Sequence, residues 1–146
     1  MRVRPVARRD RAEWLRMRTA LWPESPDDHG PEIDAFLASP PRDAVVLVAE
    51  REPGRLGGFL EAGMRSHAEG CAASPVGYLE GWWVDPDLRR SGVGRGLATA
   101  AEAWARSRGL TEMASDATAS NRSGQAAHRA LGYEKVGRIV CFRKRL

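Results

Sequence analysis

The spacing of apolar and polar positions predicts a chain in which helices and strands are mixed. Over residues 8–21 apolar side chains recur at a period near 3.6, with the arginines, including Arg18, on the outer face, which predicts an amphipathic helix. A short second helix is expected over 32–39, and two more over 93–108 and 120–131. The stretch between the first two helices carries three prolines and a glycine, so we expect a loop there.

Apolar runs bounded by turn residues predict the strands. Residues 44–50 form a buried strand, and a partner strand that begins near Phe59 completes a hairpin with it. A third long strand begins at Val76 and is closed by Asp85-Pro86, which makes the sheet so far an antiparallel meander. Shorter strands are expected at 2–6, which proline restricts to a sheet edge, at 112–115, and at 133–143 as the last element.

Length and composition favour one globular domain. The chain has 146 residues, of which 42% are hydrophobic and 29% charged, and this excludes a disordered chain, a collagen-like repeat and a disulfide-framed miniprotein. No apolar run approaches the roughly 18 residues of a membrane span, and the arginine-dotted start lacks the apolar stretch of a signal peptide, so we expect a cytoplasmic protein. Cys71 and Cys141 lack metal-ligand spacing, so we expect reduced thiols and no metal.

Charge is unevenly distributed along the chain. The net charge of +4 raises the question of a nucleic-acid partner, but the basic residues lie at the termini and in one glycine-rich turn, without interleaved aromatics, so we expect none. Residues 24–34 instead hold five acids and no Lys or Arg. This stretch either suits a cationic ligand or is a solvated loop and helix start. Its acids are Glu24, Asp27, Asp28, Glu32 and Asp34.

The most informative motif is the glycine-rich turn between the third long strand and the 93–108 helix. Free N–H groups at a helix N-terminus favour an anion, and glycines let a ligand approach the backbone closely. The motif fits neither a P-loop nor a dinucleotide fold, and a plain solvent loop would not need three arginines beside three glycines. We therefore expect a phosphate-binding turn, made by Arg89, Arg90, Ser91, Gly92, Val93, Gly94 and Arg95.

This turn resembles the acetyl-CoA pyrophosphate loop of the GCN5-related N-acetyltransferases, and the resemblance extends over the whole chain. It implies an α/β fold, one N-acetyltransferase domain over 1–146, with a mixed, mostly antiparallel sheet that is splayed at the acetyl-CoA site and flanked by helices. Residues 127–133 resemble the family's later helix and its Gly-aromatic ending. Residues that match cofactor contacts of the family are Trp82, Trp83, Val84 and Asn121.

Three further stretches are similar to the aminoglycoside 6′-N-acetyltransferases. They are Leu21-Trp22-Pro23, the stretch from Ser74 to Gly81, and Met113 to Asp116 before Asn121. The resemblance implies acetyl transfer from acetyl-CoA to the 6′-amine of an aminoglycoside by direct attack in a ternary complex, a reaction that confers antibiotic resistance. It also implies that Trp22, Glu80 and Asp116 line the aminoglycoside site. Acetylation of a peptide, protein or polyamine amine, and non-catalytic acyl-CoA binding, stay open as alternatives.

The resemblance, together with what acetyl transfer requires, implies roles for three side chains. Glu80 and Asp116 attract the polycationic substrate, and one of them passes on the amine proton. His128 occupies the slot where many family members carry a tyrosine that protonates the departing thiolate, and imidazole can do this near neutral pH. The alternatives are an outward strand residue for Glu80, a turn or helix cap for Asp116 and a packed helical residue for His128.

Two departures from the aminoglycoside enzymes bear on the substrate site. The turn at 66–69 lacks their tyrosine, and Gly137 stands where they carry an acid. Asp27, Asp28 or Glu69 can compensate for the lost charge, and we count Asp28 among the substrate-binding residues. Because many relatives are dimers and a terminal edge strand offers unpaired backbone groups, we also expect a homodimer through the last strand.

Overall fold

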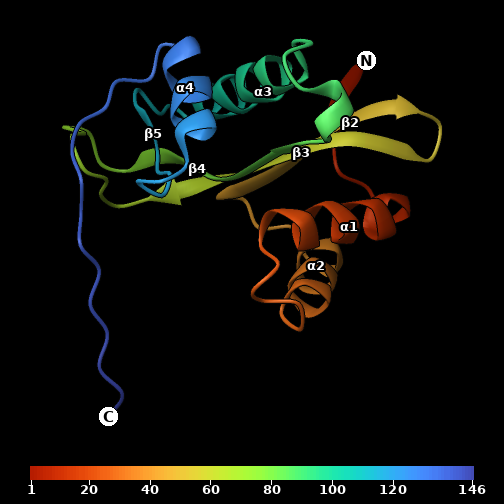
Figure 1. The fold of residues 1–146 in the computed structure, drawn as a ribbon, viewed down its shortest axis with the longest axis horizontal. Coiled ribbons are helices and arrows are strands. Elements are labelled where there is room, and N and C mark those ends of the chain that lie inside the picture. Colours follow the sequence, from red (N-terminus) through yellow and green to blue (C-terminus); the bar gives the residue numbers. More distant parts are fainter.

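The computed structural model describes residues 1–146 and has three layers, with one sheet between two pairs of helices (Figure 1). The sheet has the order β1-β2-β3-β4-β5, and the first three pairings are antiparallel while β5 runs parallel to β4. The strands are β1 (Arg2–Pro5), β2 (Ala44–Glu52), β3 (Arg55–Arg65), β4 (Val76–Val84) and β5 (Met113–Ser115). This confirms the predicted meander and the edge position of the first strand.

Helices cover both faces of the sheet. On one face lie α1 (Arg11–Leu21), which follows a 3-10 turn at Arg8–Asp10, and α2 (His29–Ala38). On the other lie α3 (Val93–Ser107) and α4 (Arg122–Ala130) (Figure 1). The helices predicted from apolar spacing are therefore present, but α2 begins at His29, three residues earlier than expected. None of the helices has both the length and the apolar character needed to cross a bilayer.

Each face of the sheet has its own apolar core. Leu47, Leu60 and Leu79 pack under α3, whose Leu97 is fully buried. On the opposite face Phe59 packs with residues of α1 and α2, which are Trp14, Met17 and Ile33. The alternation of side chains along β2 and β3 sends successive residues to the two cores. The sheet is thus held from both sides, and the α3 face fixes the glycine-rich turn at the N-terminus of that helix.

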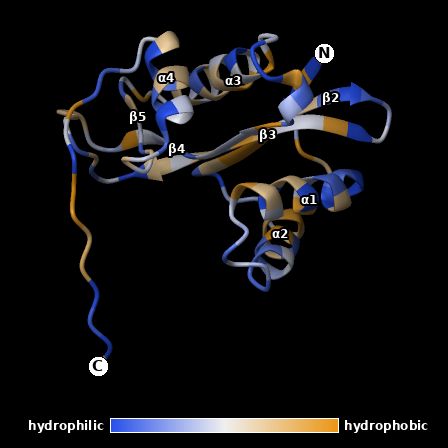
Figure 2. Ribbon diagram, viewed as in Figure 1, coloured by the Kyte–Doolittle hydropathy of each residue, from blue (hydrophilic) through white to orange (hydrophobic).

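Two expectations about the chain were wrong. Arg18 is not on the outer face of α1: it is 9% exposed and lies beside Glu61, 2.9 Å from its carboxylate. No last strand forms over 133–143, because the chain leaves α4 as an extended, exposed tail that pairs with nothing in its own sheet. Figure 2 shows an apolar stretch partway along this tail, followed by hydrophilic residues at its end.

Candidate active site

The N-terminus of α3 presents a row of free backbone donors. The peptide N–H groups of residues 90–95 donate to no carbonyl, and Gly96 is the first to bond back, to Gly92. Arg90 and Gly92 both have positive φ, 61° and 92°. Glycine adopts this conformation without strain at position 92, whereas Arg90 adopts it at a cost in backbone strain. Such donors at the start of a 15-residue helix form an anion site.

Two of the three arginines of this turn are already engaged within the chain. The Arg89 Nε donates to the Val84 carbonyl at 3.0 Å and its guanidinium lies over the Trp83 ring. Arg95 donates to the Ala130 carbonyl at the end of α4 at 3.0 Å. Both side chains therefore hold the turn to its neighbours, while Arg90 is exposed and makes no ion pair. The backbone, more than the side chains, defines this anion site.

Strands β4 and β5 are joined over only three residue pairs. Gly77, Tyr78 and Leu79 pair with Met113, Ala114 and Ser115, and beyond Leu79 the two strands have no further pairing. The resemblance predicted a sheet splayed at this place, and the structure confirms it. The gap opens toward the N-terminus of α3, because β4 leads directly into that turn.

Trp82 lies on β4, next to this gap, and its side chain contacts α3 and α4. Its ring meets His128 edge-on at 5.5 Å, and a Cβ on Gly94 would sit 3.0 Å from the indole. The Trp82 Nε1 is buried and has no hydrogen-bond partner, which leaves a donor for a ligand on this side of β4. Together with the free amides of α3, this unpaired donor fits the long, hydrogen-bonding acyl carrier of acetyl-CoA.

Asn121 has a structural role in this structure. It is the N-cap of α4, where its side-chain oxygen accepts from the Gly124 N–H at 2.9 Å. The side chain is exposed. The cofactor contact predicted for Asn121 has no test in this geometry and stays a prediction.

Glu80 sits at a bulge in β4. Glu61 of β3 pairs with Gly81 and Ala62 pairs with Leu79, so Glu80 is the additional residue. Its carboxylate accepts two hydrogen bonds from Arg65, at 2.8 Å from Nε and 2.6 Å from Nη2. This bulge lies one residue before Gly81, and it leaves the Glu80 side chain exposed at the surface.

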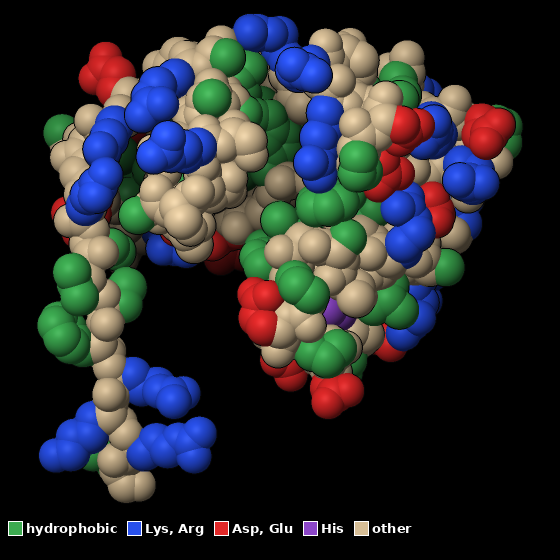
Figure 3. Space-filling model, viewed as in Figure 1, with side chains coloured by type: hydrophobic (Ala, Val, Ile, Leu, Met, Phe, Trp, Pro, Cys, Tyr) green, Lys and Arg blue, Asp and Glu red, His purple; other side chains and the backbone are tan.

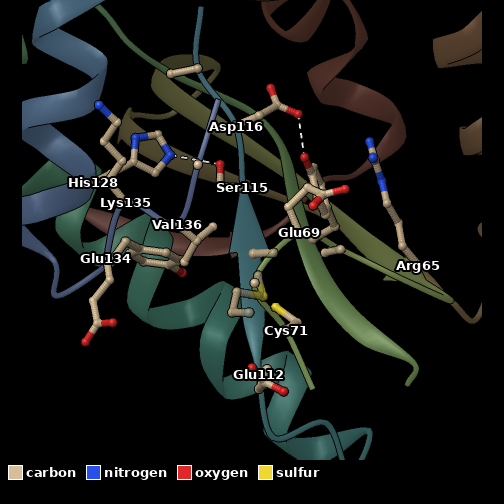
Figure 4. A pocket seen from close by; sticks show the side chains of 18 of the residues that line it. Arg65, Glu69, Cys71, Glu112, Ser115, Asp116, His128, Glu134, Lys135 and Val136 are labelled. Atoms are coloured by element: carbon tan, nitrogen blue, oxygen red, sulfur yellow. Dashed lines mark hydrogen bonds between the residues drawn. The ribbon is translucent and has the colours of Figure 1, made fainter. Parts of the chain in front are cut away.

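Asp116 follows β5 and accepts a short hydrogen bond from the Tyr78 hydroxyl, at 2.5 Å. Burial, together with this carboxylate, raises the pKa of Tyr78 to about 12, so the phenol stays protonated and keeps donating. Asp116 lies in a large cleft of about 1490 Å³ with Arg65, Glu69 and His128, as the close view shows (Figure 4). Glu69 is exposed there and its carboxylate lies 3.8 Å from His67.

Glu80 and Asp116 line different cavities. Glu80 belongs to a smaller cavity of about 320 Å³ between β3 and the α1–α2 layer, with Trp14, Glu32 and Glu61. Arg65 and Tyr78 lie between them, because the guanidinium bonded to Glu80 stacks 3.5 Å from the Tyr78 ring centre. The two carboxylates that the sequence singled out are thus brought close to one arginine and one tyrosine, which the sequence analysis missed.

Trp22 closes the end of α1 against β4. A Cβ on Gly81 would lie 2.4 Å from its ring, so the indole packs directly on the β4 backbone. It stacks on His29, and the Arg18 guanidinium lies 5.1 Å from its centre. Trp22 is half-buried, which leaves one side of the ring available beside the acidic loop that follows it.

The acidic stretch is divided between paired and unpaired carboxylates. Glu32 pairs with Arg18 at 2.7 Å and Asp34 with Arg11 at 2.6 Å, so α1 neutralises both. Asp28 holds the N-cap position of α2 without a side-chain capping bond, and it is exposed. Figure 3 shows red acidic groups on this lower part of the molecule, facing the space between the body and the tail. The unpaired carboxylates of the stretch are Glu24, Asp27 and Asp28.

His128 lies in the second half of α4, and three further contacts besides that with Trp82 hold its ring. Its Nδ1 lies 2.6 Å from the Gly124 carbonyl, which only accepts, so Nδ1 carries a proton. The Nε2 lies 2.8 Å from the Ser115 Oγ, the pair drawn in Figure 4. Tyr133 meets the ring edge-on at 5.8 Å, while its own hydroxyl donates to Glu102. Ser115, at the end of β5, is a third site residue that the sequence analysis missed, after Arg65 and Tyr78.

The structure gathers no three His, Cys, Asp or Glu side chains that could hold a metal ion. Cys71 and Cys141 are free.

Comparison with known proteins agrees with this geometry. Residues 10–133 match the model of the acetyltransferase (GNAT) family. An aminoglycoside N(6′)-acetyltransferase type 1 of Klebsiella aerogenes is 47% identical over 146 residues, which are 99% of this chain and 96% of that protein. The protein of the same name from Stenotrophomonas maltophilia is 40% identical over 142 residues, 97% of this chain and 91% of that protein.

Solved structures are similar throughout. The apo crystal structure of aminoglycoside antibiotic 6′-N-acetyltransferase AAC(6′)-IG from Acinetobacter haemolyticus has a TM-score of 0.91 and 37% identity, and covers 100% of this chain and 99% of that one. AAC(6′)-Iy in complex with the bisubstrate analogue CoA-S-monomethyl-acetylneamine has a TM-score of 0.90 and 34% identity, with 99% and 98% covered. By fold, sequence and site geometry, the chain belongs to the acetyltransferase (GNAT) family and, within it, to the group of the aminoglycoside N(6′)-acetyltransferases.

Proposed function

We propose that this protein transfers the acetyl group of acetyl-CoA to the 6′-amine of aminoglycosides, by direct attack in a ternary complex, and so confers antibiotic resistance. The observation that carries the proposal is the position of Glu80, Tyr78 and Asp116 where β4 and β5 separate, on the same strand that leads into the free amides of α3. Acidic groups and an anion site joined by one strand suit a cationic acceptor and a phosphorylated acyl donor. Residues 1–146 form one catalytic domain in this proposal.

Acetyl-CoA supplies an activated acyl group on a thioester. The amides of residues 90–95, with Arg90 and Ser91, bind its pyrophosphate, and Trp82, Trp83 and Val84 line its path along β4. The indole Nε1 of Trp82, buried and otherwise unpaired, donates a hydrogen bond to the carrier. Asn121 supports this side as the cap of α4 and as a contact for the cofactor.

The acidic groups bind and orient the aminoglycoside. Glu80 and Asp116 face its ammonium groups, Trp22 provides an apolar ring for a sugar face, and Asp28 adds a charge at the edge of the site. Either carboxylate takes the amine proton, directly or through water, because both are exposed at the surface of the site. Placing the amine near the gap supplies the proximity that the reaction requires.

The Ser115–His128 pair handles the proton that the departing thiolate needs. The Ser115 Oγ lies between the Leu79 carbonyl, at 3.2 Å, and the His128 Nε2, at 2.8 Å. Since Nδ1 is fixed as a donor to Gly124, a second proton on the ring must sit on Nε2. As the Ser115 hydroxyl takes this proton, it gives its own hydroxyl proton to the thiolate, which leaves a neutral imidazole and a neutral thiol. His128 therefore acts as general acid through Ser115, which stands at the point where β4 and β5 separate.

Thiol release from acetyl-CoA tests the proposal. We compare aminoglycosides that carry a 6′-amine with analogues that carry a 6′-hydroxyl, and add basic peptides and polyamines as further acceptors. Turnover confined to the 6′-amines is expected. Turnover with peptides or polyamines alone would replace the proposed substrate with that of the alternative acetyltransferase, and coenzyme A binding without any turnover would indicate a binding module.

We also infer that the protein works as a homodimer in which the tail of each chain, residues 134–146, lies on the other. The tail leaves Val136, Ile139, Val140 and Phe142 exposed, the last at 92%. The outer edge of β5 has no strand beside it, and the large cleft lies along that edge. A strand from a second copy satisfies both the exposed apolar side chains and the unpaired edge.

Sedimentation velocity tests the dimer. The full chain is expected to sediment as a dimer, and Ile139→Glu as a monomer. Leu146→Glu, at a residue that is even more exposed and lies beyond the apolar stretch, is the control and leaves the dimer intact. A full chain that sediments as a monomer at micromolar concentration would contradict the inference.

We also propose that the protein works in the cytoplasm, because both of its cysteines are free thiols.

A further inference from the structure

Arg65 occupies the acidic part of the site in this structure. Its guanidinium makes two charge-assisted hydrogen bonds to Glu80 and lies 3.5 Å from the centre of the Tyr78 ring. Tyr78 in turn donates to Asp116. One cation of the chain itself thus contacts Glu80, which the proposed function assigns to the substrate, and the aromatic face of Tyr78 beside it. Its charge also acts on Asp116.

Arg65 also lies between the two cavities of the site. Arg65 and Tyr78 line the large cleft with Asp116, while Glu80 lines the smaller cavity on the α1–α2 side. Arg65 is the last residue of β3, and its side chain reaches Glu80 on the neighbouring strand β4. Figure 4 labels Arg65 among the residues that line the large cleft. Its side chain is 44% exposed, so it can leave this position without uncovering the core.

The interactions of Arg65 are those that an alkylammonium group also makes. A carboxylate accepts hydrogen bonds from either cation, and an aromatic face attracts either. A ligand ammonium that reaches Glu80 must therefore compete with the guanidinium. Since the pair is partly exposed, the competition is modest, and the arginine can move into solvent when it loses.

We propose that Arg65 determines specificity by occupying the ammonium subsite of Glu80 and Tyr78 in the free enzyme, so that substrate binding displaces it. This inference rests on the proposed function. Substrates whose ammonium groups reach Glu80 must displace Arg65 in order to bind. The affinity of substrates that lack such a group does not depend on Arg65. Arg65 then lowers the affinity for the first class without taking part in the chemical step.

Arg65→Met is the decisive variant, because it keeps an apolar stem over Tyr78 and removes the charge. The expected result is a KM, and a calorimetric Kd, roughly three- to tenfold lower for 6′-amine aminoglycosides, with kcat changed less than about twofold. Arg65→Lys keeps a cation without the two-pronged bond and should fall between. Arg11→Met removes an equally exposed, doubly bonded arginine, that of Asp34, and should change neither constant.

A double-mutant cycle identifies Glu80 as the point of competition. In a Glu80→Gln background the internal ion pair is gone, so adding Arg65→Met should no longer tighten binding measured by calorimetry. A higher Kd for Arg65→Met would show that Arg65 positions Glu80 for the substrate. An unchanged Kd would show that Arg65 does not compete with the substrate. Either result overturns the inference. If the wild-type protein neither binds nor acetylates aminoglycosides, the proposed function fails first, and this is visible before any variant is compared.

Discussion

The N-terminal half of the molecule and its C-terminal end use charged and polar groups in opposite ways. In the first half, buried and half-buried charges are paired: Arg4 with Asp10 and Glu50, and Arg18 with Glu61. At the C-terminal end α4 has no buried residue, and the tail beyond it is exposed. The comparison indicates that the first half is a scaffold whose buried charges are paired within the chain, whereas the C-terminal end leaves its side chains exposed.

The largest effect is expected where the scaffold's buried pairs are broken. Asp10→Ala leaves the buried guanidinium of Arg4 without its best partner, whose oxygens lie 2.7 and 2.9 Å away, and should lower the free energy of unfolding by about 3 kcal/mol. Urea denaturation measures this. Asp34→Ala removes the exposed partner of Arg11 and should cost less than about 1 kcal/mol. Equal losses would contradict the idea that burial makes the first pair important.

A second test acts where the scaffold meets the site. Gly81→Ala places a Cβ 2.4 Å from the Trp22 ring, so the indole must shift, and we expect a loss of about 2 kcal/mol with a higher KM for the aminoglycoside. Gly96→Ala, whose Cβ meets only Val3 at 3.5 Å, should be neutral or stabilising. Both are measured by thermal unfolding. A Gly81→Ala protein as stable as wild type would show that Trp22 is not fixed against β4.

Asn121 provides a smaller test at the open end. Asn121→Ala removes the only side-chain cap of α4 and should lower the free energy of unfolding by about 1 kcal/mol, while Asn121→Asp preserves the cap. Calorimetric affinity for coenzyme A separates the two roles of the residue. If Asn121→Asp restores stability but not affinity, the amide also contacts the cofactor. If both variants bind coenzyme A with wild-type affinity, Asn121 acts only as the cap of α4.

The smallest effect concerns pH. Burial works to raise the pKa of Asp85, but hydrogen bonds from Arg16 and Trp83 outweigh it, so the pKa lies below its usual range. The unfolded chain then binds more protons than the folded one near pH 4, and stability falls as the pH is lowered from about 5 to about 3. In Asp85→Asn this fall should be shallower, whereas Asp87→Asn at an exposed ion pair should change it less. If stability falls equally steeply with decreasing pH in the wild type and both variants, Asp85 does not contribute to the acid sensitivity.

Much of the fold could be predicted because its signals are local. The apolar spacing of the α3 helix and the runs of β2 and β4 indicate their structures without knowledge of their neighbours, and the glycine-rich turn has its own backbone logic. The last strand was predicted wrongly for the opposite reason: residues 133–143 have strand-like composition, but composition does not show whether a segment reaches a partner, and this one pairs with no strand of the sheet although the outer edge of β5 is free. The burial of Arg18 depends on Glu61, 43 residues away, which periodicity does not reveal.

The site was predicted in part. Glu80, Asp116 and His128 are all in or beside the gap region, but their immediate partners Arg65, Tyr78 and Ser115 were missed. Tyr78 and Ser115 carried a signal, since each lies two residues or fewer from a carboxylate already singled out. Arg65 carried none, because only the pairing of β3 with β4 brings it to Glu80.

The free amides at the start of α3 have a consequence for how this enzyme can change. Main-chain donors persist whatever side chain each position carries, so single substitutions at Arg90 or Ser91 leave the hydrogen-bonding pattern of residues 90–95 in place. The substrate face, by contrast, is made of side chains and is free to drift toward new antibiotics. An inhibitor anchored on the amides would therefore meet the part of the enzyme from which resistance has the fewest routes of escape.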